Sequence, residues 1–153
     1  MDEGTLRVLV VDDHPGVRLG IANLVQGEHP RMQAVAAVGT AEEALAETAL
    51  LQPHVVVLDV NLGHADGLAL IPALRRLAPC RVVVITSSSE PRIPRRAQEM
   101  GAAACVHKTS PAHELLAHIG MPAPDLGAVH PLLAGSAMSW PADDQAPGLT
   151  GRT

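Results

Sequence analysis

The sequence predicts an α/β protein with a parallel β-sheet covered by helices on both faces. Apolar strand-like runs alternate five times with segments of helical pattern, which is typical of this class. Three of the five runs are nearly continuous stretches of Val, Leu and Ile, as expected for strands buried on both faces. The predicted strands cover residues 6–11, 33–38, 54–58, 81–85 and 103–107.

The first two of five predicted helices have clear start or stop signals. Apolar residues recur on one helical face over residues 15–25, and Pro15 suits a first helical position. Thr40 and Glu43 form a capping-box pattern that opens the second helix. Pro53 ends that helix, because a proline cannot continue it.

The other three helices are bounded by prolines or glycines. The third covers about residues 67–77, and Pro72 inside it should kink it or delay its start. The fourth lies within residues 91–100 and is closed by Gly101. The fifth begins at Ser110-Pro111 and runs to Ile119.

The order of the strands follows from the connections between them. Right-handed crossovers leave few arrangements of five parallel strands, and we expect the flavodoxin-like order 2-1-3-4-5. This order places strands 1, 3, 4 and 5 side by side. It leaves strand 2 at the edge, where its end at Gly39-Thr40 offers no charged group.

Polar side chains follow those four neighbouring strands at the point where each strand ends. They are Asp12-Asp13, Asp59, Thr86 and Lys108. Ligands of open α/β sheets bind outside the carboxyl ends of the strands, so these groups should converge. Carboxylates bind hard cations such as Mg²⁺, an Asp can attack phosphorus as a nucleophile, and a Lys can neutralise phosphoryl oxygens.

Composition excludes several other classes. The 153 residues suit one domain with a tail, and a net charge of −5 disfavours a large basic surface for nucleic acid. No apolar run approaches a membrane span, and the acidic N-terminus lacks the basic start of a signal peptide. We therefore expect a cytoplasmic protein with no direct nucleic-acid or membrane contact. Cys80 and Cys105 are expected to be buried thiols rather than a disulfide.

Residues 120–153 differ in character from the rest. They contain five prolines, five glycines and one basic residue, a composition that cannot hold a long helix or a central strand. We expect a domain over residues 5–119 followed by a mostly irregular tail. The apolar residues 126–140 should dock weakly on the domain or on a neighbouring chain.

The motifs around the strand ends resemble those of response regulator receiver domains of two-component systems. The similar segments are VLVVDDHPGVR at 8–18, VVVLDVNLGHADGLALIPALRRL at 55–77, VVVITSSS at 82–89 and GAAACVHKTSPAHELLAHI at 101–119. The DDHP and KTSP segments look most like the subfamily that usually carries a C-terminal helix-turn-helix. Here 34 Pro/Gly-rich residues follow Ile119, too few for that domain.

The resemblance implies a role for each of these residues in phosphorylation. Asp59 would accept a phosphoryl group from a histidine kinase, a phosphotransfer protein or a small phosphodonor. Thr86 would donate a hydrogen bond to that group, and Lys108 would pair with it. The domain would then signal through a downstream protein target, and it would not be a metabolic enzyme.

The resemblance also implies one Mg²⁺ ion as cofactor. Asp13 and Asp59 would bind it, Asp12 would assist through water, and the Asn61 carbonyl would complete the protein ligands. The face made by the fourth helix, fifth strand and fifth helix would meet partners or form a homodimer.

Three residues depart from the family pattern. Gly63 stands where proline is usual after the phosphoacceptor, so this loop should be more mobile. Cys105 replaces the aromatic residue that moves with the threonine in signalling, and Pro94 should shorten or distort the start of the fourth helix. These departures leave open an alternative, a receiver-like binding module with lost or altered switching.

Two other functions are less well supported. An aspartate-nucleophile phosphohydrolase would need an Asp where Asn61 stands, and a DNA-binding regulator would need a second domain. The eight histidines fit no zinc pattern and should have surface or packing roles. Arg92, Arg95 and Arg96 form either a solvated helix face or a site for an acidic partner.

Overall fold

We describe residues 4–120 of a computed structural model of the chain. Residues 1–3 and 121–153 lie outside the described part. The predicted irregular tail, and the docking of residues 126–140, fall among the residues that are not described. The division near residue 120 therefore stays a prediction.

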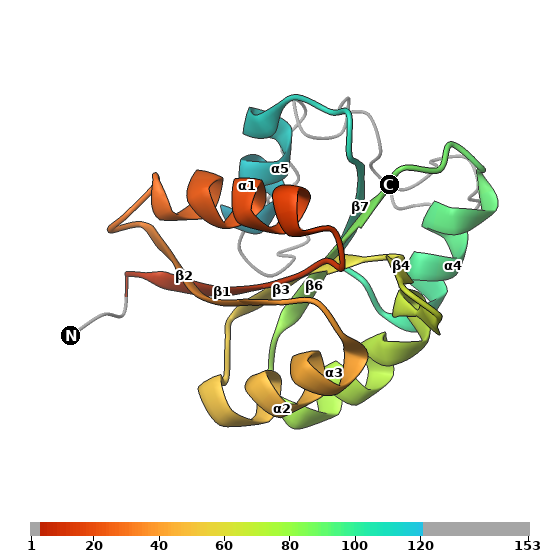
Figure 1. The fold of residues 1–153 in the computed structure, drawn as a ribbon, viewed down its shortest axis with the longest axis horizontal. Coiled ribbons are helices and arrows are strands. Elements are labelled where there is room, and N and C mark those ends of the chain that lie inside the picture. The colour runs from red at the N-terminus through yellow and green to blue at the C-terminus, as the bar shows by residue number, and fades with distance from the viewer. Residues whose placement is uncertain (1–3, 121–153) are drawn as a thin grey trace, which may run out of the picture.

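Five parallel strands form the central sheet, in the order β2-β1-β3-β6-β7 (Figure 1). This confirms the predicted flavodoxin-like order, because β6 and β7 are the fourth and fifth strands of the sheet along the chain. The strands are β1 Leu6–Val11, β2 Met32–Val38, β3 Val55–Asp59, β6 Arg81–Thr86 and β7 Ala104–His107. Each lies within two residues of its predicted bounds.

The predicted five α-helices cover both faces of this sheet. In Figure 1, α1 and α5 lie on one side, and α2 and α3 lie on the other. Helix α4 packs Ala97 into the same apolar layer as α2 and α3. The helices are α1 Pro15–Gln26, α2 Ala41–Leu51, α3 Ile71–Leu77, α4 Arg92–Met100 and α5 Ala112–Gly120.

The core consists of two apolar layers, one on each face of the sheet. Side chains alternate along a strand, so Val8 and Val10 of β1 face α1 and α5 while Leu9 and Val11 face the other helices. All four are fully buried. Continuous apolar strands are therefore needed here, because both faces exclude water.

Prolines and capping residues lie at the starts of α2, α3 and α4. Pro72 delays α3: a short 3₁₀ helix, η1 (Gly67–Leu70), precedes it. The Thr40 hydroxyl accepts a hydrogen bond from the Glu43 N–H, but the Glu43 carboxylate accepts from Gly39 rather than from Thr40. Pro94 lies within the first turn of α4, where a missing N–H is tolerated.

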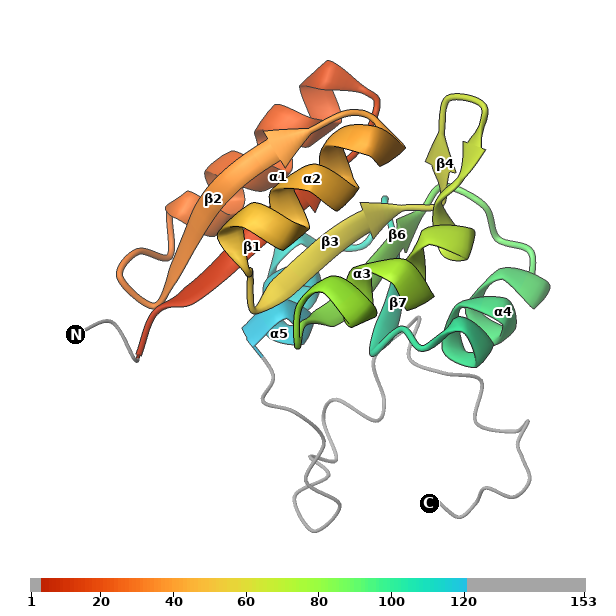
Figure 2. The same ribbon diagram turned by 90° about the horizontal axis from the view of Figure 1, so that it is seen from below.

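A small hairpin after β3 was not predicted. It pairs β4 (Asn61–Leu62) with β5 (Ala65–Asp66), and Figure 2 shows it projecting beside the end of the sheet. Gly63 turns the hairpin with φ +62°, a conformation closed to proline. The glycine at this position thus serves a defined turn.

Both cysteines are free and buried, as predicted. Burial raises the pKa of the Cys105 thiol to about 12, so it packs as a small apolar group. Within residues 4–120, no helix has the length and apolar character needed to cross a bilayer.

Candidate functional site

The predicted polar groups lie at one end of four adjacent strands. Asp12 follows β1, Asp59 ends β3, Thr86 ends β6 and Lys108 follows β7. The strand order places these ends next to one another. The convergence expected from the sequence is therefore a consequence of the sheet topology.

Three carboxylates form the acidic part of the site. Asp12 and Asp59 are almost completely buried, whereas 29% of the Asp13 side chain is exposed. Backbone N–H groups hold one oxygen of each carboxylate. His14 N donates to Asp12 Oδ1 at 2.8 Å, Asn61 N donates to Asp59 Oδ1 at 3.2 Å, and Gly63 N donates to Asp13 Oδ2 at 2.7 Å.

Lys108 supplies the positive charge of the site and is the only lysine in the sequence. Its Nζ lies 3.1 Å from Asp12 Oδ2 and 3.1 Å from Asp59 Oδ2. Its backbone N–H donates to the Thr86 carbonyl at 2.8 Å, which fixes the residue against the end of β6. One lysine therefore faces two buried carboxylates.

The balance of charge at the site is unfavourable for the Asp59 carboxylate. Burial and the nearby Asp12 raise the pKa of Asp59, while the Lys108 ammonium and the Asn61 N–H oppose this rise. Burial alone would lower the pKa of Lys108, but its contacts with Asp12 and Asp59 raise it overall. The three carboxylates need more positive charge than one lysine provides.

Thr86 ends β6 and Asn61 follows β3, and their roles toward a phosphoryl group and Mg²⁺ stay predictions. The buried Thr86 hydroxyl accepts a hydrogen bond from Ser88 N at 2.9 Å. The hydrogen bonds of residues 4–120 do not join this hydroxyl to Asp59 or Lys108. Asn61 contacts Asp59 through its backbone N–H, and its role as a carbonyl ligand remains a prediction.

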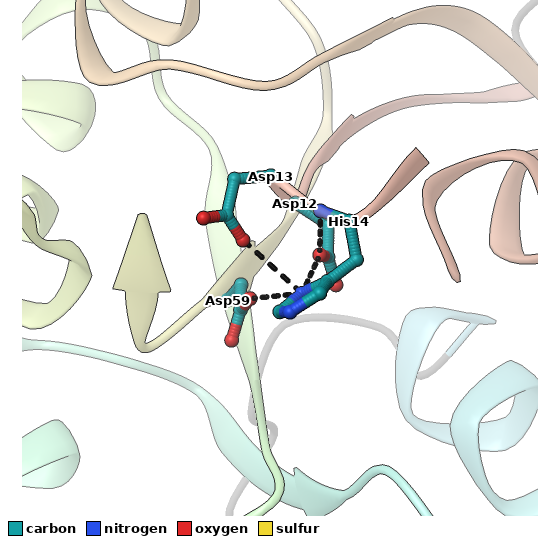
Figure 3. A group of neighbouring side chains, drawn as sticks. All are labelled: Asp12, Asp13, His14 and Asp59. Atoms are coloured by element: carbon teal, nitrogen blue, oxygen red, sulfur yellow. Dashed lines mark hydrogen bonds and ion pairs between the residues drawn. The ribbon is translucent and has the colours of Figure 1, made fainter. Parts of the chain in front are cut away.

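His14 is a member of the site that the sequence analysis did not single out. Its Nδ1 lies 3.1 Å from Asp12 Oδ1, 3.1 Å from Asp13 Oδ1 and 3.8 Å from Asp59 Oδ2. Figure 3 shows its ring turned toward the three carboxylates. Its position directly after Asp12-Asp13 is the signal that could have identified it.

The donor set fits a divalent cation. Ligand atoms of Asp12, Asp13, His14 and Asp59 all lie within 4.8 Å of one another. Asp12 Oδ2 and Asp13 Oδ1 are buried oxygens without a hydrogen-bond donor in the described residues, although Lys108 and His14 lie close to them. Carboxylate oxygens so arranged are suitable ligands for Mg²⁺.

The fold and the site together define an α/β domain of the receiver class. Residues 8–120 match the response regulator receiver domain family, and the chain belongs to that family. Receiver domains bind Mg²⁺ through an acidic pocket and interact with histidine kinases or phosphotransfer proteins.

Curated relatives carry receiver domains in longer proteins. A protein-glutamate methylesterase/protein-glutamine glutaminase of Cereibacter sphaeroides is 33% identical over an alignment 159 residues long, gaps included, that covers 90% of this chain and 42% of that protein. The response regulator GacA of Pseudomonas protegens is 35% identical over 112 residues, covering 72% of this chain and 52% of GacA. The chain thus spans about half or less of these relatives.

Solved receiver structures have the same fold. A LuxR-family two-component response regulator from Aurantimonas sp. gives a TM-score of 0.68 at 31% identity, covering 73% of this chain and 80% of that one. The response regulator domain of Thermotoga maritima CheB gives 0.67 at 27% identity, covering 75% and 93%.

Proposed function

We propose that this receiver is phosphorylated on Asp59 in a Mg²⁺-dependent reaction and signals by protein contact. The supporting observation is the position of Asp59, a buried carboxylate between Lys108 and the Asp12-Asp13 pair. A histidine kinase or phosphotransfer protein would supply the phosphoryl group. Signalling would pass to a downstream protein, and the face of α4, β7 and α5 would meet it or form a homodimer.

Each residue has a role that its contacts support. Asp59 would attack phosphorus, while Lys108 would offset the charge of the phosphoryl oxygens. Asp12, Asp13 and Asp59 would hold Mg²⁺, with the Asn61 carbonyl as a further ligand. The ion would neutralise charge on the incoming phosphate, which three carboxylates alone would repel.

Thr86 is suited to hold the phosphoryl group once it is attached. Its hydroxyl already accepts a hydrogen bond from Ser88 N, and a hydroxyl that accepts can still donate its own proton. Thr86 can therefore donate to a phosphoryl oxygen without losing its contact with Ser88. This contact would connect phosphorylation to the loop over residues 87–91.

The experiment is phosphorylation by acetyl phosphate in the presence of Mg²⁺, followed by intact-mass measurement. The wild type should gain one phosphate mass, Asp59→Asn should gain none, and Asp13→Ala should lose both labelling and Mg²⁺ binding. Asp66→Asn is the matched control, because Asp66 is an exposed carboxylate on the nearby hairpin. Equal labelling of wild type and Asp59→Asn would refute the proposal.

A second candidate is a receiver-like binding module with altered switching. The observation that favours it is Cys105, which is fully buried in β7 and offers no ring that could change rotamer. Under this alternative, phosphorylation would leave the partner-binding face unchanged. Partner affinity that is the same with and without beryllofluoride would favour it.

A further inference from the structure

The arrangement around His14 Nδ1 is unusual for a hydrogen bond. One ring nitrogen faces three carboxylate oxygens, from Asp12, Asp13 and Asp59, at 3.1, 3.1 and 3.8 Å (Figure 3). A ring nitrogen carries at most one proton. That proton can point at one oxygen, or be shared between two, and the remaining oxygen receives no proton from the ring.

The backbone of His14 is also fixed at this place. Its N–H donates to Asp12 Oδ1 at 2.8 Å, and the residue precedes the first residue of α1 with extended backbone angles. The side chain of His14 is 62% exposed, and the ring edge that carries Nδ1 faces the acidic cluster. The sequence position and the backbone therefore both direct Nδ1 to the carboxylates.

The spacing of these atoms matches that of ligands on one ion. Two neighbouring ligands of an octahedral ion with bonds of about 2.1 Å lie about 3 Å apart. The separations of His14 Nδ1 from Asp12 Oδ1 and from Asp13 Oδ1 are both 3.1 Å. The nitrogen lone pair and the carboxylate oxygens could therefore coordinate the same ion.

We propose that His14 Nδ1 is a ligand of the divalent site and gives it a preference for borderline transition metals over Mg²⁺. This inference rests on the metal site of the proposed function. Imidazole nitrogen suits Ni²⁺, Cu²⁺ and Zn²⁺, whereas Mg²⁺ selects oxygen and keeps its waters. A site of carboxylates and one imidazole can bind transition metals and Mg²⁺, but only the transition metals gain affinity from the nitrogen.

The test is calorimetric binding of Ni²⁺ and Mg²⁺ to the full unphosphorylated chain at one fixed pH. His14→Ala should weaken Ni²⁺ binding by about tenfold or more, a range typical when a group supporting a metal is removed. Its Mg²⁺ affinity should change by no more than about twofold, because Mg²⁺ gains little from imidazole. His64→Ala is the matched control, since His64 is exposed on the hairpin turn, and it should leave both affinities unchanged.

A direct readout identifies the ligand atom. With Cu²⁺ bound, electron paramagnetic resonance of the wild type should show coupling to a ring nitrogen, and this coupling should disappear in His14→Ala. Retained coupling in that variant, or an equal loss of Ni²⁺ affinity in His64→Ala, would overturn the proposal. A gain of Mg²⁺ and Ni²⁺ affinity alike in His14→Ala would show that the ring only obstructs the site, which also overturns it.

The two proposals fail in different ways. Binding is measured without phosphate, so a His14-dependent Ni²⁺ preference would stand even if acetyl phosphate did not label Asp59. Conversely, Mg²⁺-dependent labelling of Asp59 with no His14 effect on Ni²⁺ would leave the proposed function standing and remove this one.

Discussion

Asp59 is a carboxylate whose surroundings oppose its charge more than they support it. Burial and Asp12 raise its pKa, and the two groups that stabilise its charge do not outweigh them. The same excess of negative charge favours the binding of a cation at this site. Lys108 is the only permanent positive charge that contacts both Asp12 and Asp59 in the described residues.

Lys108→Ala should lower the free energy of unfolding by about 1–3 kcal/mol, because it leaves two buried carboxylates without their cation. Added Mg²⁺ should restore part of this loss, since an ion that binds only the folded state stabilises it. Urea denaturation with and without Mg²⁺ measures both effects. Arg95→Ala, which changes an exposed arginine of α4, is the control, and equal stability of Lys108→Ala and wild type would contradict the prediction.

His118 should make the fold sensitive to mild acid. Burial lowers the pKa of His118 below 6.5, Glu114 opposes this shift and Arg81 adds to it. The folded state then binds fewer protons than the unfolded state between the lowered pKa and 6.5. Its contribution to stability is complete above pH 6.5 and is lost as the pH falls through that window.

The measurement is the free energy of unfolding between pH 7 and pH 5. His118→Gln should reduce the fall in stability, while His113→Gln, an exposed histidine of the same helix, should keep the wild-type slope. The free energy of unfolding of His118→Gln should still fall somewhat as the pH falls, because burial and Arg7 also lower the pKa of His54. A slope that His118→Gln does not change would refute the assignment.

Sequence reasoning located most site residues because they occupy strand ends. Topology alone brings Asp12, Asp59 and Lys108 together once the strand order is known. The sequence shows that His14 follows Asp12-Asp13, but the direction of its ring depends on local hydrogen bonds that the sequence does not report. The place of His14 in the cluster and the contact from Ser88 to Thr86 therefore emerged only from the structure.

At the scale of elements, the hairpin of β4 and β5 connects the site to α4. At the base of the hairpin, Asn61 N contacts the Asp59 carboxylate. Asp66 pairs with Asn61 across the two strands, and its Oδ2 lies 2.8 Å from Arg96 Nη2 of α4. Both partners are nearly half exposed, so this ion pair adds little stability but does join the two elements.

Gly67 follows this hairpin as the first residue of η1, and it lies against the backbone at the end of β3. A Cβ at Gly67 would collide with the Asp59 carbonyl oxygen and lie 2.9 Å from the Val60 carbonyl oxygen. Backbone atoms cannot move aside cheaply, so Gly67→Ala should cost at least about 1–3 kcal/mol of stability. It should also weaken Mg²⁺ binding by displacing Asp59.

Thermal unfolding and Mg²⁺ calorimetry of the Gly67 variant test both effects. Gly16→Ala is the matched control in helix α1, where an added Cβ would meet nothing within 4 Å. That variant should be neutral or more stable by up to about 1 kcal/mol, because alanine favours helix. If the two variants behave alike, steric contact at Asp59 is not the cause.

Activation should change the amide exchange of the hairpin and of the loop over residues 87–91 more than that of β7. Both segments contact site residues directly, through Asn61 N and Ser88 N, whereas Cys105 has no large ring to move. Amide exchange with and without beryllofluoride should show its largest changes at residues 61–66 and 87–91, extending into α4. Arg96→Ala should reduce the change in α4, and changes centred on β7 would contradict this view.

The elements that were predicted have strong patterns, and the one that was missed does not. Helices repeat apolar residues with a fixed period, and buried strands are short continuous apolar runs, so their ranges follow from the sequence. The hairpin has only two residues in each strand, too few for any period. The delayed start of α3 was one of the two outcomes expected from Pro72, because a proline acts locally on a helix.

At the scale of the whole molecule, α5 is the last helix needed to complete the packing of the domain. Leu115 and Ile119 complete the apolar layer on the α1 side of the sheet, and Ile119 is fully buried. Arg81 of β6 donates to the carbonyls of His118 and Ile119, the first at 3.1 Å. These contacts hold the end of α5 against the start of β6.

The contacts of α5 predict how far the chain can be shortened from its C-terminus without loss of stability. A chain of residues 1–120 keeps both apolar layers, so its free energy of unfolding should lie within about 0.5 kcal/mol of the full chain. A chain of residues 1–117 loses Ile119 and leaves Arg81 without its acceptors, and it should be about 2–5 kcal/mol less stable. Urea denaturation followed by circular dichroism compares all three chains without using Trp140, which both deletions remove. A large loss of stability in the chain of residues 1–120 would show that residues 121–153 contribute to the fold and that the predicted division near residue 120 is wrong.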